Sequence, residues 1–153
     1  VTEQRVDETL AVYQPYYDSH NLILTRPYEG VLSALDKLKE KYAVGVVSNK
    51  QDTAVKPMCA RFFGEALYAL GEVPGCPRKP APDMLYKAMK HIGVDRFIYV
   101  GDSEVDVLTA RNAAVPCLSV LWGFRDRALL EQAGATHFCT QPAAVLPVSS
   151  ASD

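Results

Sequence analysis

From residue 43 onward, short apolar segments alternate regularly with segments of helical periodicity. Residues 43–47 form a continuous apolar run, which is typical of a strand buried on both faces. The alternation predicts strands at 43–47, 66–70, 97–100, 117–121 and 136–139, and helices at 53–63, 83–92, 107–114 and 128–132. Because strands that alternate with helices pair in parallel through right-handed crossovers, we expect a three-layer, Rossmann-like α/β domain with a parallel sheet.

The segment before residue 43 has a different pattern. Apolar or aromatic side chains at Val6, Leu10, Tyr13 and Tyr17 predict a helix over residues 2–20, which Pro15 should kink or interrupt. Residues 21–25 are expected to be extended, and residues 31–38 to form a second helix. A loop rich in proline and glycine is expected at 72–82, a helix end at Gly93 and a frayed tail at 148–153.

Composition excludes several classes of protein. The chain has 153 residues, 48% of them apolar, and a net charge of −2, so nothing in its charge favours binding to nucleic acid or to an anionic membrane. No apolar run approaches the roughly 18 residues of a membrane span, and no signal peptide is recognised. The four cysteines show no C-x-x-C spacing, which favours reduced thiols and a cytoplasmic location.

Polar residues that could take part in catalysis or binding follow three of these segments. Asp102 and Asp106 come after the strand at 97–100, Ser48-Asn49-Lys50 follows the strand at 43–47, and Lys79 lies in the proline-rich loop. The carboxyl ends of parallel strands share one edge of the sheet, and ligands bind there in open α/β folds. Carboxylates, a hydroxyl and an ammonium at this edge suit a phosphate site assisted by Mg²⁺, because the cations offset repulsion between phosphate and carboxylates.

Each of these residues also has a simpler interpretation. Ser48 and Asn49 could form a turn or a helix cap, and Lys79 could be a solvated loop residue. Asp102 could cap a helix, and Asp106 could be an exposed acid in a first helical turn. Their occurrence together at strand ends favours the functional interpretation over these separate ones.

Three motifs resemble those of the haloacid dehalogenase superfamily. They are Val46-Val47-Ser48-Asn49-Lys50, Arg78-Lys79-Pro80-Ala81-Pro82 and Gly101-Asp102-Ser103-Glu104-Val105-Asp106, which are similar to motifs II, III and IV of that family. Two flanking segments, residues 26–31 and 121–125, look like the phosphoglycolate phosphatase branch. The resemblance runs from the amino end to about residue 146 and implies an α/β core (residues 26–147), a C-terminal remnant of a helical cap (1–25) and a flexible tail (148–153).

The resemblance also implies a role for each residue. Ser48 would hydrogen-bond the transferring phosphoryl group, and Lys79 would neutralise its charge. Asp102 would bind Mg²⁺ directly or through water, while Asp106 would support the metal and orient Lys79. Asn49 and Lys50 would line the substrate pocket. The implied reaction is hydrolysis of a small phosphomonoester through an aspartyl-phosphate.

One element of the family pattern is missing. The nucleophile of the family lies in a D-x-D-x-T motif after a first strand, and no Asp-x-Asp occurs in this sequence, which begins with Val1. We therefore expect a truncated chain that is inactive alone and binds Mg²⁺ weakly. In the family the missing strand lies between the strand ending at Ser48 and the one ending at Asp102. Those two strands should either pair directly or leave edges that promote self-association.

Two alternatives are weighed against this phosphatase. A catalytically dead fold retained as an interaction or regulatory module is disfavoured by the intact motif residues. A phospho-accepting receiver domain is disfavoured because its acid pair would come near the start of the chain. Phosphoglycolate is the expected substrate by resemblance only. Arg125 could reach a carboxylate of the substrate, but its simpler interpretation is an exposed residue at the start of a helix.

Overall fold

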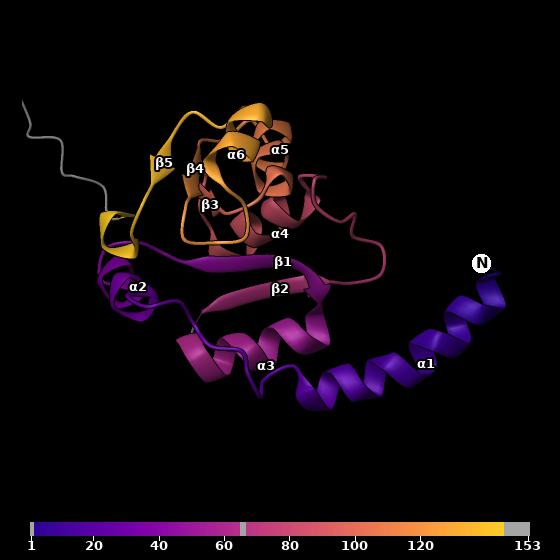
Figure 1. Ribbon diagram of the computed structural model, residues 1–153. Coiled ribbons are helices and arrows are strands. Elements are labelled where there is room, and N and C mark those ends of the chain that lie inside the picture. The colour runs from indigo at the N-terminus through magenta and orange to yellow at the C-terminus, as the bar shows by residue number, and fades with distance from the viewer. Residues whose placement is uncertain (1, 65–66, 146–153) are drawn as a thin grey trace, which may run out of the picture.

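Strands and helices alternate along most of the chain (Figure 1). The computed structural model describes residues 2–64 and 67–145. Its helices are α1 (Glu3–His20), α2 (Val31–Lys39), α3 (Asp52–Phe63), α4 (Asp83–Ile92), α5 (Glu104–Asn112), α6 (Arg127–Gln132) and a 3₁₀ turn (Pro142–Val145). Its strands are β1 (Gly45–Gln51), β2 (Tyr68–Glu72), β3 (Tyr99–Gly101), β4 (Cys117–Val120) and β5 (Phe138–Cys139).

The strands form two parallel sheets, which confirms the predicted α/β class. One sheet has the order β1-β2 and the other has the order β3-β4-β5. Within the described residues β1 and β3 are not hydrogen-bonded to each other. Direct pairing of these two strands, one of the two expected outcomes, is therefore wrong. Self-association through their edges stays a prediction.

Helices cover the sheets and join them. Figure 1 shows α3 on one side of β1 and β2, and α4 on the side that faces the second sheet. The helix α5 packs on β3 and β4. Val47 of β1 packs against a buried cluster in the second half of the chain, which consists of Leu85, Tyr99, Ala110 and Ala113. This apolar contact brings the first sheet against the core of the second.

The end of β1 differs from the prediction. The strand continues through residues 48–51, where we expected a loop, and its pairing with β2 is irregular between Val47 and Gln51. None of the strand's residues is fully buried, so the apolar run does not mark a strand covered on both faces. Polar residues can continue this strand because its last residues are exposed and need not be apolar. Hydropathy alone does not detect such an extension.

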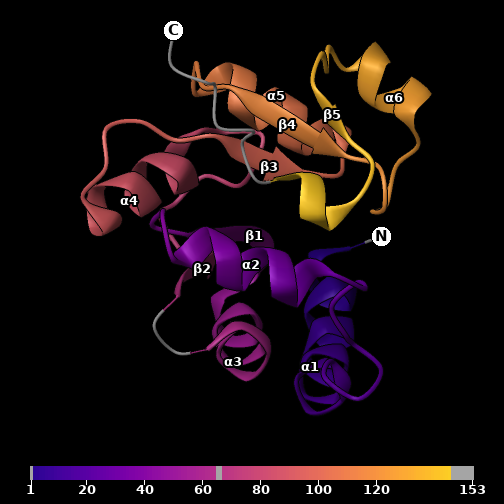
Figure 2. The same ribbon diagram turned by 90° about the vertical axis from the view of Figure 1, so that its left-hand side faces the viewer.

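The amino-terminal helix also differs from the prediction. Pro15 lies inside α1 but does not interrupt it, because the exposed helix can hydrate the carbonyl that loses its partner. No residue of α1 is buried, and Figure 2 shows the helix beside α3, below the sheets. Residues 21–24 form a turn and not an extended segment, with the Asn21 N–H donating to the Tyr17 carbonyl. The expected tail at 148–153 lies outside the described residues, and the division at residue 25 stays a prediction.

Most other boundaries match within three residues. The predicted helix at 83–92 is confirmed, and it ends at Gly93, whose φ is 78°. The helix α5 begins three residues earlier than expected because Ser103 and Asp106 cap its amino end reciprocally. None of the helices in the described part of the chain could span a lipid bilayer. All four cysteines are free.

Close backbone contact joins the start of α3 to β2. The Asp52 carboxylate accepts a hydrogen bond from the Gly71 N–H at 2.9 Å. A Cβ atom at Gly71 would lie 2.5 Å from the Asp52 backbone nitrogen and Cα. A Cβ atom at Gly45 would be too close only to the tip of the Ile92 side chain, at 2.9 Å, and would make ordinary contact with Tyr68. Residue 71 must therefore lack a side chain for α3 to start where it does.

We expect Gly71→Ala to lower the free energy of unfolding by about 2–4 kcal/mol, because backbone must move to relieve the overlap. The matched variant Gly45→Ala should cost about 1 kcal/mol or less, since a flexible side chain can give way. Urea unfolding monitored by circular dichroism measures both. Equal losses in the two variants would contradict the close contact at Gly71.

The Asp52 ion pair gives a pH dependence. Burial raises the pKa of the Asp52 carboxyl, but hydrogen bonds from Lys56 and the Gly71 N–H, with the charge of Lys56, lower it below its ordinary 3.8 overall. A depressed pKa stabilises the fold above the unfolded value, and this contribution is lost as pH falls through the folded value. Asp52→Asn should therefore cost about 0.5 kcal/mol at pH 7, and this cost should shrink as the pH falls below the ordinary pKa of 3.8. Unfolding measured at pH 7 and through this acid range tests this, and a pH-independent cost would contradict it.

Candidate active site

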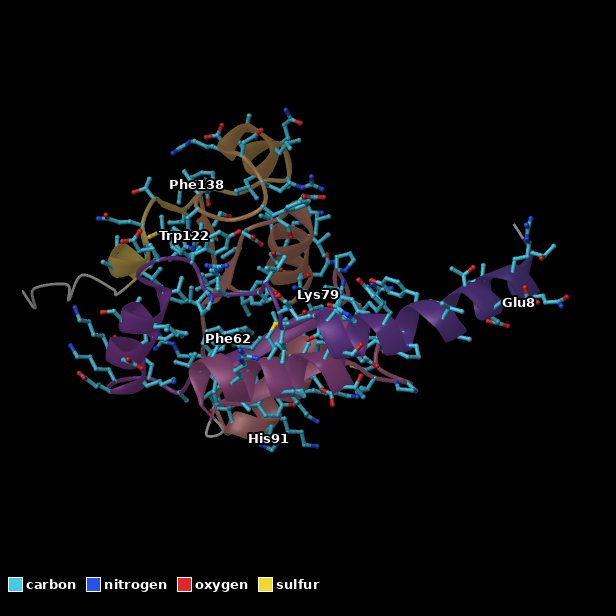
Figure 3. The ribbon with its side chains drawn as sticks, turned by 60° about the horizontal axis from the view of Figure 1, so that its bottom comes forward. Glu8, Phe62, Lys79, His91, Trp122 and Phe138 are labelled. Carbon is cyan, nitrogen blue, oxygen red and sulfur yellow. The ribbon has the colours of Figure 1, made fainter. Side chains whose placement is uncertain are left out.

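The predicted site residues gather at the carboxyl ends of β1 and β3. Ser48, Asn49 and Lys50 lie near the end of β1, and Asp102 directly follows β3. Asp106 lies in the first turn of α5, and the loop between β2 and α4 brings in Lys79, which Figure 3 labels near the middle of the molecule. Hydrogen bonds link Asn49, Lys79, Asp106 and Asp102, which are far apart in the sequence, although β1 and β3 belong to separate sheets.

Asn49 holds the backbone of Lys79 by two hydrogen bonds. Its side-chain amide nitrogen donates to the Lys79 carbonyl at 2.9 Å, and its amide oxygen accepts the Lys79 N–H at 2.9 Å. The loop that carries Lys79 is thus fixed to β1. Asn49 acts here through the lysine backbone, whereas the resemblance placed it as a residue lining the pocket.

The Lys79 ammonium forms a three-membered polar cluster with Asp106 and Tyr99. Its Nζ donates to Asp106 Oδ1 at 2.7 Å and to the Tyr99 hydroxyl at 3.0 Å, and that hydroxyl donates to the same Oδ1 at 2.9 Å. The side chains of Lys79 and Asp106 are only 12% and 7% exposed. Sequence reasoning missed Tyr99. The available signal was a polar-tipped aromatic residue two positions before Gly101 in a strand segment.

Asp106 uses both carboxylate oxygens within the protein. Besides the two bonds to Oδ1, its Oδ2 accepts from the N–H groups of Asp102 and Ser103 and, at 2.6 Å, from the Ser103 hydroxyl. Burial raises the pKa of Asp106, but the charge of Lys79 and these hydrogen bonds outweigh it, so the carboxyl stays ionised. Asp106 is therefore a buried anchor and not an exposed first-turn acid.

Asp102 is held differently and keeps one oxygen available. Its Oδ2 accepts the Phe124 N–H at 2.8 Å, and a Cβ atom at Gly123 would overlap the carboxylate. In the hydrogen bonds of the described residues, Oδ1 has no donor. A glycine likewise makes room for the second acid, since a Cβ at Gly101 would overlap Asp106.

The cations at this edge differ in their partners. The Lys50 ammonium donates to the Tyr17 hydroxyl of α1 at 2.6 Å and lies 5.3 Å from the centre of its ring. Arg125 instead forms two hydrogen bonds with Glu104, at 2.8 and 2.9 Å, so the structure engages it within the protein. Ser48 is half-buried, and its hydroxyl accepts the Lys50 N–H at 3.1 Å.

The described residues meet only part of what Mg²⁺ requires. They contain no group of three acidic, histidine or cysteine side chains that could hold a metal ion. One open carboxylate oxygen, at Asp102, is a suitable single ligand. Since Mg²⁺ is commonly bound by one or two carboxylates with water and substrate phosphate, Asp102 fits such a site as one member.

Residues 1–120 match the family model described as haloacid dehalogenase-like hydrolase. The chain belongs to this family. A pyrophosphatase PpaX from Halalkalibacterium halodurans is 32% identical over 138 residues, covering 84% of this chain and 62% of that protein. A crystal structure from Lactobacillus delbrueckii, provisionally assigned as a phosphoglycolate phosphatase, shares 40% identity with a TM-score of 0.86 and covers 95% of this chain and 62% of that one.

A predicted phosphoglycolate phosphatase from Haemophilus somnus has 25% identity and a TM-score of 0.81, over 95% of this chain and 67% of its own. These similarities confirm the resemblance to the haloacid dehalogenase superfamily and the Rossmann-like core. The chain spans about three-fifths of the length of the first relatives compared.

We expect Lys79→Ala to destabilise the fold by about 3 kcal/mol, because it leaves the buried Asp106 carboxylate without its cation. Lys87→Ala, at an exposed position of α4, serves as the matched control and should change stability by about 0.5 kcal/mol or less. Chemical unfolding of both variants measures the difference. Similar losses would show that the buried ion pair is not needed by the fold.

Proposed function

We propose that the chain forms the core of a Mg²⁺-dependent phosphomonoester hydrolase. One observation carries the proposal: a largely buried lysine is held by Asp106 and Tyr99, and Asp106 also accepts a hydrogen bond from the backbone N–H of Asp102, whose Oδ1 is open. A fixed positive charge and a metal ion held by a separate carboxylate together stabilise the negative charge of a transferring phosphoryl group.

The proposed roles follow from the contacts of each side chain. Lys79 has three N–H donors and uses two within the protein, which leaves one for a phosphoryl oxygen. The Ser48 hydroxyl, at the end of β1, would donate a second hydrogen bond. Asn49 sets the position of Lys79 through its backbone, and Asp106 sets the direction of its ammonium. Both are positioning residues in this scheme.

Asp102 would hold Mg²⁺ through its open oxygen, and Asp106 would support the metal only indirectly, because its own oxygens are occupied. When bound, Mg²⁺ supplies charge neutralisation and polarisation of a phosphoryl oxygen. The backbone of Phe124 and the space at Gly123 hold the Asp102 carboxylate in place. These contacts would aim its second oxygen at the metal.

The nucleophile of the reaction is not among the residues described above. The sequence has no Asp-x-Asp, so the aspartyl-phosphate of the family would need a carboxylate outside this cluster. We therefore propose that these 153 residues alone bind phosphate weakly and do not turn it over.

The proposed substrate is a small phosphorylated metabolite. The relatives are a pyrophosphatase and phosphoglycolate phosphatases by their names, and both of those substrates carry a second anionic group. Lys50 offers a second ammonium near the end of β1, and in the described residues it pairs with a phenol and not with a carboxylate. It would be free to meet that second anion. Neither nucleic acid nor a membrane is a proposed partner, and a cytoplasmic location stays a prediction.

The deciding experiment measures phosphate release from 2-phosphoglycolate and from p-nitrophenyl phosphate, together with Mg²⁺-dependent binding of inorganic phosphate. The wild-type chain should bind phosphate with Mg²⁺ and release none. Asp102→Asn, which keeps the size of the side chain, should weaken the Mg²⁺-dependent binding at least about tenfold.

Two results would contradict the proposal. Phosphate binding that does not respond to Mg²⁺ or to Asp102→Asn would remove the metal from the site. Turnover by the wild-type chain that Asp102→Asn abolishes would show that the account of the nucleophile is wrong.

A further inference from the structure

We propose that Tyr99 is a positioning residue that sets the direction of the Lys79 ammonium toward a bound phosphoryl group. This inference rests on the proposed function and adds a residue to its site. The Tyr99 hydroxyl lies 3.0 Å from Lys79 Nζ and 2.9 Å from Asp106 Oδ1, while these two atoms are 2.7 Å apart. Three polar atoms thus form a closed triangle.

A single ion pair would hold the ammonium by one hydrogen bond. With only Asp106 Oδ1 as acceptor, Nζ could swing about that oxygen through changes in the side-chain dihedral angles of Lys79, and its remaining donors would swing with it. A second acceptor at the Tyr99 hydroxyl restricts this movement, since two of the three donors then have fixed partners. The third donor then points in one defined direction. A donor that is already oriented stabilises developing negative charge without a further rearrangement of the protein.

A phenol suits this position because it donates and accepts together. Its proton goes to Asp106 Oδ1, so its lone pairs face the ammonium. A phenylalanine would lose both bonds, and an acidic residue would add a second negative charge beside Asp106. The hydroxyl therefore orients the lysine without changing the charge of the cluster.

Packing fixes the Tyr99 ring. The residue is 9% exposed and belongs to a buried cluster with Leu85, Ala110 and Ala113. Val47, one residue before Ser48, packs against the same cluster. These apolar contacts hold the ring of Tyr99 in place on β3, the strand that leads to Asp102. The position of the hydroxyl is therefore fixed by the packing of the ring.

The first test observes the ammonium itself. In ¹H–¹⁵N spectra of the 153-residue chain at low temperature, the Lys79 ammonium should give a slowly exchanging signal, assigned by its loss in Lys79→Arg. In Tyr99→Phe that signal should shift, and its protons should exchange about tenfold faster, because one of two hydrogen bonds is gone. Tyr86→Phe, at an exposed position of α4, should leave the signal unchanged. A missing signal in the wild type, or an unchanged one in Tyr99→Phe, would overturn the inference.

The second test measures the dissociation constant of inorganic phosphate in the presence of Mg²⁺. Tyr99→Phe should weaken binding about tenfold, the equivalent of one charge-assisted hydrogen bond, and Tyr86→Phe should not. Equal binding by the wild type and Tyr99→Phe would overturn the role of Tyr99 and leave the proposed function standing. If the wild type binds no phosphate, the proposed function fails, and the ammonium signal alone decides whether Tyr99 orients Lys79.

Discussion

The buried ion pair between Lys79 and Asp106 is the interaction on which this structure depends. The two sheets share no hydrogen bonds within the described residues, yet Lys79 reaches both of them. Its backbone is held by Asn49 of β1, and its side chain is held by Asp106 of α5. Lys79 therefore joins the two halves of the site. Removal of either partner of this largely buried ion pair would be strongly unfavourable.

The two aspartates have separate tasks because their surroundings differ. Asp106 accepts five hydrogen bonds and stays ionised in spite of its burial, so it serves as the anchor of the cluster. Asp102 keeps one oxygen open and is held from behind by the backbone of Phe124. Two glycines, at 101 and 123, leave the space that these carboxylates fill. Small residues thus decide where the charges lie.

Within the described residues, a hydrogen bond and a cation–π contact link α1 to the end of β1. The helix buries none of its own residues, yet its Tyr17 hydroxyl accepts a hydrogen bond from Lys50 at the end of β1. Figure 3 shows that the other end of this helix, at Glu8, lies far from the site.

The sequence by itself determined the α/β class, the order of the elements and the polar residues near the ends of β1 and β3, because periodicity and strand-end position are local properties of a chain. It also located the lysine and both aspartates through motif spacing. Only the tertiary structure decided that β1 extends through polar residues, that β1 and β3 do not pair, and that Tyr99 completes the cluster. These features depend on which distant groups meet: the hydroxyl of Tyr99 finds its partners 20 residues before it and seven residues after it in the sequence.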